Sequence, residues 1–231
     1  MLQALYSTLI NNPECSYSMA YGKMVYNIYQ KKHTYKDFQS KRINQLTMFQ
    51  ELFGRGKNES QFQVVWNKLY KKELLKDLYF LNTGSEDTEF NSRVYIRSLY
   101  AIIIEIELYY WYQRNTSITH LKINPHYIDR MNSYYICLNN IPIRNYKLRA
   151  LCLEKLYKTI INIRYYTHNT KYNIRHQAKL LFLNTYKEFY SNKSLELYRK
   201  IGLSIFYFLP ITYYIFMKLM QVRTKFTRIC L

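Results

Sequence analysis

The chain has 231 residues, enough for one large domain or two small ones, and its formal net charge is +19. It contains 27 Tyr and 12 Phe but only 5 Gly and 4 Pro, so obligatory turns are few and long helices are favoured. The four cysteines include no C-x-x-C pair, which argues against a zinc ribbon or a disulfide framework and favours reduced thiols in an internal compartment.

The positive charge is concentrated in the second half of the chain. Residues 1–120 hold 15 Lys/Arg and 11 Asp/Glu, a net charge of +4, whereas residues 121–231 hold 19 and 4, a net charge of +15. This half predicts an anionic partner: phospholipid headgroups such as those of cardiolipin, RNA phosphates, or acidic neighbouring subunits. The first basic residue is Lys23, so the preceding residues resemble neither a signal peptide nor an Arg-rich transit peptide.

The beginning of the chain predicts helices separated by polar breaks. We expect one helix over residues 15–30 and a second over residues 36–53, with Thr34 as its N-cap. A turn is expected at Gly54–Asn58. This turn contains a G-x-G sequence, but no strand is predicted before it and the further Gly and Lys of a phosphate loop are missing.

A third helix is predicted by a capping box. Ser60 and Gln63 have the spacing of a hydroxyl at the N-cap and an amide three residues later, and the helix would run to about Leu81. The following segment, Asn82–Ser92 (NTGSEDTEFNS), is the clearest predicted loop and holds the one acidic cluster of the sequence.

The segment Arg93–Gln113 (RVYIRSLYAIIIEIELYYWYQ) predicts a deeply buried helix, because apolar residues cover most of its circumference. Glu105 and Glu107 lie inside it. Residues two apart do not face each other on a helix, so we do not expect a catalytic carboxylate pair. We expect these side chains to pair with Arg93, Arg97 or a partner chain.

An irregular link is predicted over Asn115–Tyr127. His120 and His126 lie in this link, and Cys137 and Cys152 follow, but their spacing matches no zinc finger, so no metal site is predicted. No catalytic or cofactor-binding motif is present. The sequence therefore predicts a protein that is not an enzyme and holds no cofactor.

Two amphipathic helices after a break at Pro142 predict an antiparallel hairpin with a short link at residues 168–170. The apolar stripe of the first helix consists of Leu148, Cys152, Leu156, Ile160 and Ile163. The stripe of the second consists of Ile174, Ala178, Leu181, Phe182, Thr185 and Phe189. The polar faces opposite are predicted to point outward and carry Lys147, Glu154, Lys158, His176, Lys179 and Lys187.

The longest apolar run, Ile201–Met220 (IGLSIFYFLPITYYIFMKLM), predicts one membrane-spanning helix. Its uncharged part covers roughly 25 Å, and Lys218 can extend it to roughly 30 Å. The alternative is a buried helix in a large soluble complex. The predicted anchor residues are Ile201, Phe206, Phe208, Pro210, Ile215 and Phe216. The predicted contacts to lipid headgroups or acidic partners are Arg199, Lys200, Lys218, Arg223, Lys225 and Arg228.

These elements predict an all-α fold: an irregular helical domain with a C-terminal amphipathic helix hairpin, followed by a single transmembrane helix. Residues 1–200 would form the basic, mostly helical domain, with breaks near residues 82–92 and 113–127. Residues 201–220 would form the transmembrane helix and residues 221–231 a basic tail. Lys and Arg flank both ends of the apolar run, so its orientation stays open.

Stretches such as RYYTHNTKYNIRHQAKLLFLNTYKEFYSNKSLELYRK (residues 164–200) resemble ciliate mitochondrially encoded proteins. The resemblance is one of composition and covers the whole chain: Tyr, Ile, Asn, Lys, Phe and Leu are abundant, and Gly, Ala and Pro are scarce. Known proteins of this kind are divergent or lineage-specific subunits of respiratory complexes, of the ATP synthase or of the mitochondrial ribosome. The resemblance implies no particular functional residue.

The sequence and the resemblance together predict a non-catalytic accessory subunit of a respiratory-chain complex in the mitochondrial inner membrane. Its partners would be other subunits of that complex and anionic phospholipid such as cardiolipin. The alternative is a mitochondrial ribosomal protein that binds rRNA through its basic C-terminal half. Nucleic acid is a partner under that alternative alone.

Overall fold

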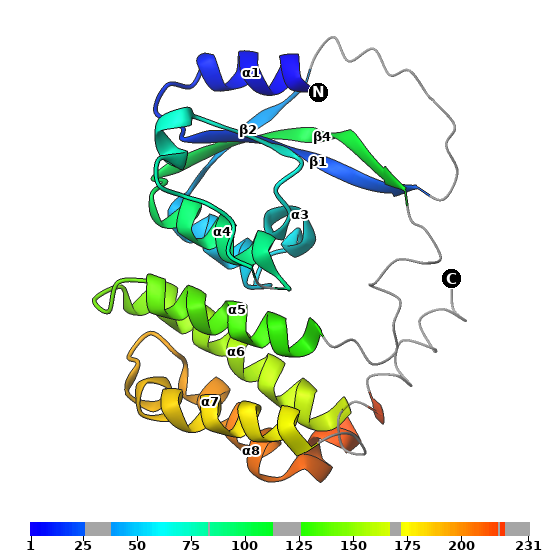
Figure 1. Cartoon of the computed structure of the whole chain (residues 1–231), viewed down its shortest axis with the longest axis vertical. Coiled ribbons are helices and arrows are strands. Elements are labelled where there is room, and N and C mark those ends of the chain that lie inside the picture. The colour runs from blue at the N-terminus through cyan, green and yellow to red at the C-terminus, as the bar shows by residue number, and fades with distance from the viewer. Residues whose placement is uncertain (26–37, 83, 113–125, 167–171, 217, 220–231) are drawn as a thin grey trace.

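A four-stranded sheet lies at one end of the molecule and a group of long helices at the other (Figure 1). The computed structural model describes residues 1–25, 38–82, 84–112, 126–166, 172–216 and 218–219. The predicted all-α fold is therefore wrong, because the first half of the chain is mixed α/β. We call residues 1–112 the α/β layer and residues 126–219 the helical layer.

The sheet contains β1 (Tyr17–Val25), β2 (Ser40–Asn44), β3 (Lys68–Tyr70) and β4 (Tyr100–Tyr112), in the order β2-β4-β1-β3. The central pair, β1 and β4, is parallel, whereas β2 pairs antiparallel with β4 and β3 pairs antiparallel with β1. Strand β4 occupies most of the segment that was predicted to be a buried helix. Its β-branched and aromatic residues favour a strand, and a short apolar run fits either structure.

The sheet is covered on both faces. Helix α1 (Leu2–Ile10) lies on one face, and α2 (Gln45–Leu52), α3 (Glu59–Gln63) and α4 (Glu86–Ile96) lie on the other (Figure 1). Alternate residues of the central strands serve the two sides, because side chains along a strand point to opposite faces. Ala20 and Ile104 pack with Leu5 under α1, whereas Met19 and Ile103 belong to the main core.

Three further predictions in the α/β layer are corrected. Strand β1 replaces the described part of the helix predicted over residues 15–30, and β2 plus α2 replace that of the helix over residues 36–53. Asn44 caps α2 by accepting a hydrogen bond from the Thr47 N–H, and Thr34 lies outside the described residues. The capping box at Ser60 does not start a long helix: α3 ends at Gln63 and is followed by β3 and a short 3₁₀ helix, η1 (Lys72–Leu75).

Two predicted boundaries differ in their outcome. The turn at Gly54–Asn58 is confirmed, and Gly54 adopts a positive φ of 76°, which glycine accepts without strain. The loop predicted over Asn82–Ser92 is shorter than expected, because α4 already begins at Glu86. The acidic residues Glu86 and Asp87 lie in its first turn, where they complement the positive end of the helix dipole.

The helical layer consists of α5 (His126–Asn140), α6 (Tyr146–Tyr166), α7 (Tyr172–Ser191) and α8 (Leu197–Phe208). The break at Pro142 is confirmed between α5 and α6. The predicted hairpin is also confirmed: α6 packs antiparallel on α7, with Arg149 contacting Glu188 and Tyr157 contacting Phe182. All five stripe residues predicted for α6 are buried, and the predicted link at residues 168–170 lies outside the described residues.

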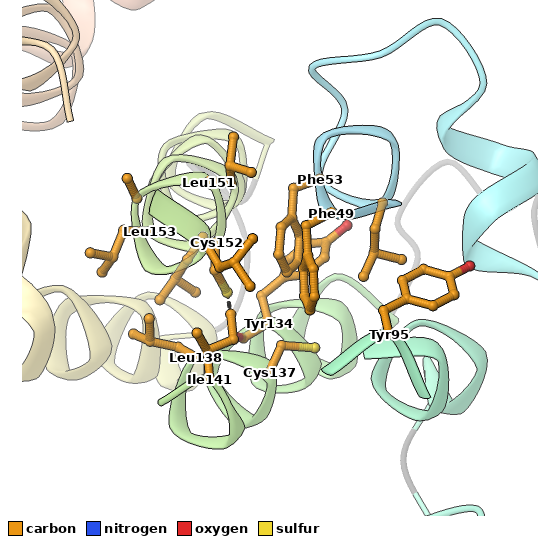
Figure 2. Packing of buried hydrophobic residues seen from close by; sticks show 14 of the residues in the cluster. Phe49, Phe53, Tyr95, Tyr134, Cys137, Leu138, Ile141, Leu151, Cys152 and Leu153 are labelled. Atoms are coloured by element: carbon orange, nitrogen blue, oxygen red, sulfur yellow. Dashed lines mark hydrogen bonds between the residues drawn. The ribbon is translucent and has the colours of Figure 1, made fainter. Parts of the chain in front are cut away.

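One continuous core joins the two layers. Figure 2 shows Phe49 of α2 and Phe53, the residue that follows α2, facing Tyr134 and Cys137 of α5, with Cys152 of α6 beside them. The Phe53 and Tyr134 rings meet edge to face at 6.0 Å, and the Cys152 thiol donates a hydrogen bond to the Tyr134 carbonyl at 3.3 Å. The helical layer therefore packs on the α/β layer through buried aromatic residues.

Candidate docking surface

The apolar run predicted to cross a membrane has a different structure. Helix α8 begins at Leu197, before the run, and ends at Phe208. Leu209 has non-helical backbone angles, and Pro210 has no N–H to continue the helix, so the helical conformation resumes at residue 210, and residues 210–216 and 218–219 are helical. Within the described residues, no helix combines the length and the hydropathy that a bilayer crossing requires. The single transmembrane helix of the predicted fold is corrected accordingly.

Helix α8 has an inner face that is fully packed. Leu203 and Tyr207 are buried on it. The Tyr207 ring stacks on Phe182 of α7 at 3.5 Å, and the guanidinium of Arg164 from α6 lies 4.2 Å from the centre of the same ring. This face holds α8 against the hairpin without using its remaining apolar residues.

The opposite side of α8 is an exposed apolar stripe. Spacings of four, four and three residues place side chains on one side of a helix. Here these positions are Leu197, Ile201, Ile205 and Phe208, which we call the outer stripe. Their exposed fractions are 70%, 49%, 42% and 58%. An amphipathic helix normally buries such a stripe, so α8 has one apolar face more than the described residues of this chain cover.

Further apolar residues extend the exposed surface beyond the stripe. Tyr186 and Tyr190 of α7 are exposed, and the Tyr190 hydroxyl hydrogen-bonds the Ser204 hydroxyl of α8, which places this part of α7 next to α8. After the break, the exposed apolar residues are Leu209, Ile211, Tyr214, Ile215, Phe216 and Leu219. A large exposed apolar area marks a surface that binds a protein or a membrane.

The predicted anchor residues are mostly at the surface. Ile201, Phe208, Pro210, Ile215 and Phe216 are exposed. Phe206 is half-buried, because its ring packs 5.3 Å from the rings of both Tyr213 and Phe216. Five of the six predicted anchor residues therefore lie at the surface; the spanning helix predicted there was wrong, and their role as an anchor stays a prediction.

The predicted cationic contacts lie in different surroundings. Arg199 points inward and donates to Glu154 at 2.6 Å and to Glu196. Lys200 donates to the Tyr190 carbonyl at 2.7 Å, and the Lys218 ammonium lies 5.5 Å from the centre of the Tyr214 ring. Arg223, Lys225 and Arg228 lie outside the described residues.

Glu154 is the main correction among the charged residues. It was predicted on the outward face of its helix, yet it is buried and accepts hydrogen bonds from Arg55, Lys158 and Arg199. Burial opposes its ionisation, but the hydrogen bonds from Lys158 and Arg55 outweigh burial and hold the pKa of Glu154 below its ordinary value. No local sequence signal could reveal this, because Arg55 is 99 residues away.

Two buried cations elsewhere, Lys68 and Arg149, bond to other parts of the chain. Lys68 is buried on β3 and donates to the Gln61 carbonyl at 2.8 Å, to the Val64 carbonyl and to the Asn67 side chain. Desolvation lowers its pKa to about 7. Arg149 lines a small pocket of ≈ 260 Å³ between α6 and α7, where it forms a bidentate pair with Glu188.

The carboxylate pair is exposed, whereas the cysteines of the described residues are buried. Glu105 and Glu107 are exposed on β4, and Glu107 pairs with Lys23 at 3.2 Å. Burial raises the pKa of the Cys137 thiol to about 12, which opposes thiolate formation. Among the described residues, no group of three or more His, Cys, Asp and Glu is placed to hold a metal ion. His120 and the side chain of His126 lie outside them.

Two comparisons with known proteins found no match. No model of a known protein family matches the chain, and no curated protein matches it in sequence. The function is therefore inferred from the outer stripe, the residues around it and the charge of the helical layer.

Proposed function

We propose that this protein is a non-catalytic accessory subunit of a respiratory-chain assembly at the mitochondrial inner membrane, and that the outer stripe of α8 attaches it. The observation that carries the proposal is the second apolar face of α8, which is exposed while the first is fully packed. Apolar surface gains roughly 25 cal/mol per Å² when it leaves water, so four large side chains in one row provide a strong driving force for attachment.

The non-catalytic part of the proposal is supported by how the buried ionisable groups are used. Glu154, Arg149 and Lys68 each bond to other parts of the chain, so their charges help to hold the fold together. Active sites usually combine a pocket with titratable groups whose pKa values are tuned for chemistry. In the described residues the strongest surface feature is apolar instead.

The mitochondrial setting is supported by composition and charge. The chain resembles ciliate mitochondrially encoded proteins in its residue usage, and known proteins of that kind include subunits of respiratory complexes. The net charge of +15 in residues 121–231 suits an environment rich in anionic lipid.

The test is fractionation of native mitochondria in mild detergent, with and without RNase, followed by quantification of this protein across a density gradient. We expect it to migrate with a respiratory complex in both samples, alongside a known subunit of that complex as the internal control. Migration as a single chain in both samples would contradict the proposal.

A ribosomal role is the second candidate, because one feature of the α/β layer favours it. Trp66 stacks on Tyr109 with ring centres 4.1 Å apart and lies 5.2 Å from Trp111, which gathers three half-buried aromatic rings at the end of β4. Aromatic rings beside basic surface are a common platform for RNA bases. If RNase shifts the protein out of a large particle together with ribosomal proteins, this candidate replaces the first.

A further inference from the structure

We infer that the outer stripe of α8 inserts into the interface of an anionic bilayer, with the helix lying parallel to the membrane plane. This inference rests on the proposed function and names one partner for the outer stripe, an anionic bilayer. It differs from the predicted spanning helix, because the helix would lie on one leaflet and cross neither. The length of the stripe, its chemistry and the charges around it support this position of the helix.

The length of the stripe suits a helix that lies in the interface. From Leu197 to Phe208 the helix rises about 16 Å, roughly half the thickness of a bilayer core. Interfacial helices bury one apolar face to a shallow depth and keep their polar residues in the headgroup layer. Helix α8 fits this geometry with the difference that its other face is fixed to α6 and α7.

The chemistry of the stripe suits hydrocarbon. Leu197, Ile201, Ile205 and Phe208 carry no hydrogen-bonding group, so an acyl layer satisfies them completely. Tyrosines border the stripe: Tyr190 of α7 on one side and Tyr198 of α8 on the other are both exposed. Tyrosine is enriched where membrane meets water, because its ring is apolar and its hydroxyl is polar.

The charges around the stripe are unbalanced toward positive. Residues 172–219 contain seven Lys/Arg and two Glu, a net charge of +5. Both glutamates are already paired, Glu188 with Arg149 and Glu196 with Arg199. The exposed Lys187 and Lys193 make no ion pair within the described part of the chain. The nearby carboxylates therefore do not neutralise these lysines, and an anionic surface is the complementary partner.

The same charges weigh against two other occupants. A second copy of this chain would bring two basic surfaces together, since the chain carries +19 overall. RNA would meet the lysines, but the four stripe residues offer its bases no hydrogen bond and only one ring. The break at Leu209 also leaves exposed apolar residues on both sides of a bend, to which fluid acyl chains can conform.

The first test is flotation of the full-length protein with vesicles of two compositions: pure phosphatidylcholine, and about four parts phosphatidylcholine to one part cardiolipin. We expect binding to the cardiolipin vesicles to be roughly tenfold stronger or more, and to weaken in about 0.5 M salt, because salt screens the lysines. Equal binding to both vesicles, or no binding to either, overturns the inference.

Matched variants locate the contact. Ile201→Ser with Phe208→Ser removes half of the outer stripe, and we expect vesicle binding to fall roughly tenfold or more. The control is Leu2→Ser with Ile10→Ser, which changes two comparably exposed apolar residues on α1 at the opposite end of the molecule (Figure 1). Equal loss in both pairs overturns the inference. Circular dichroism melting shows that each variant is folded.

A second pair of variants tests the charge. Lys187→Gln with Lys193→Gln should weaken binding to cardiolipin vesicles, whereas Lys72→Gln with Lys76→Gln, an equal change of charge among exposed lysines of the α/β layer, should not. Equal effects from the two pairs would mean that net charge alone drives binding, and the assignment to α8 would fail.

Insertion is read by a reporter in the stripe itself. The indole introduced by Phe208→Trp should be quenched by lipids brominated on their acyl chains, whereas Trp66 and Trp111 lie in the α/β layer and supply an unquenched background. Binding without quenching overturns insertion of the stripe.

The outcomes separate this inference from the proposed function. If the protein does not bind vesicles but migrates with a respiratory complex, the stripe docks on protein, and only the bilayer inference fails. If it binds vesicles through the stripe but RNase moves it out of ribosomal particles, the respiratory role fails and the bilayer contact stands.

Discussion

The α/β layer and the helical layer differ in the charges that accompany their exposed apolar residues. In the α/β layer, both faces of the sheet are covered, and several cations at its surface have carboxylate partners: Lys23 with Glu107, and Arg42 with Glu14. In the helical layer, the outer stripe stays exposed, and its neighbouring lysines have no such partner within the described residues. Exposed apolar residues also lie on α1 of the α/β layer, at Leu2, Tyr6 and Ile10, but residues 1–12 carry no charged side chain, whereas the outer stripe lies in the basic half of the chain.

The two layers are nevertheless one folding unit. Phe49 and Phe53 of the first layer pack on Tyr134 of the second, and the Arg55 guanidinium reaches across to Glu154 of α6. A change at this boundary should therefore affect both layers, whereas a change in the outer stripe should affect neither. We therefore expect the largest loss of stability at the boundary between the layers and the smallest at the outer stripe.

Phe49→Ala should give the largest loss of stability. Phe49 is fully buried, and its ring contacts Phe53 at 5.6 Å and Tyr95 at 6.1 Å. Truncation leaves a cavity at the boundary between the layers and should lower the free energy of unfolding by about 3–5 kcal/mol. Urea unfolding monitored by circular dichroism measures this. A loss below about 1 kcal/mol would show that the boundary contributes little to the core.

Glu154→Gln should lower the free energy of unfolding by about 2–4 kcal/mol. The substitution leaves Arg55, Lys158 and Arg199 around a neutral amide, and the partial exposure of these cations keeps the loss below that of a fully buried pair. Glu73→Gln, at an exposed position in η1, is the control. Similar chemical denaturation midpoints for the two variants would refute the importance of this network.

Lys68 should make stability depend on pH within the α/β layer. Its pKa is lowered to about 7 in the folded protein by desolvation, whereas an unfolded lysine titrates near 10.4. Between these values the unfolded state binds the extra proton, so stability rises with pH by up to about 1.4 kcal/mol per unit. Below pH 7 both states are protonated and this dependence ends.

The measurement is the unfolding free energy of the wild type and of Lys68→Met at a series of pH values from about 6 to about 9. The difference between the two should change mainly above pH 7, in favour of the wild type as pH rises. A constant difference across the whole range would contradict the lowered pKa.

The outer-stripe pair Ile201→Ser with Phe208→Ser should have the smallest effect on stability, within about 1 kcal/mol. Both side chains are half-exposed or more, so little packing is lost. The same pair should abolish attachment. A variant that loses binding while its stability is nearly unchanged separates the outer stripe from the core. A loss of several kcal/mol would mean that the stripe is part of the core.

The parts of the fold that could be predicted are those fixed by local periodicity. Helices α6 and α7 are long and carry apolar residues at helical spacing, which predicts them, although buried residues such as Leu151 and Leu153 cover further sides of α6. The sheet was missed because β4 is apolar on nearly all sides at its start: Ala101, Ile102, Ile103 and Ile104 are all buried. Such a run fits a buried helix as well as a central strand.

The candidate site was predictable by residue and not by structure. The apolar run identified Ile201 and Phe208 as residues that meet a partner, which remains a proposal. It gave no sign that Leu203 and Tyr207, from the same run, would be used inside the fold. The inward direction of Arg199 depends on Glu154, which lies 45 residues earlier, and no local pattern reports such a contact.

The parallel pairing of β1 with β4 has a consequence for how the chain folds. Residues 18–25 find their partners at residues 102–112, so the centre of the sheet cannot form until more than 80 residues of intervening chain have been made. Contacts of this sequence separation slow folding, whereas the α6–α7 hairpin closes over a short distance. During synthesis β1 can pair with β3 before β4 is made, but the edge that β4 will occupy stays unpaired, and a nascent chain in this state is open to aggregation. The sheet that is covered on both faces in the finished protein is thus exposed while the protein is being made.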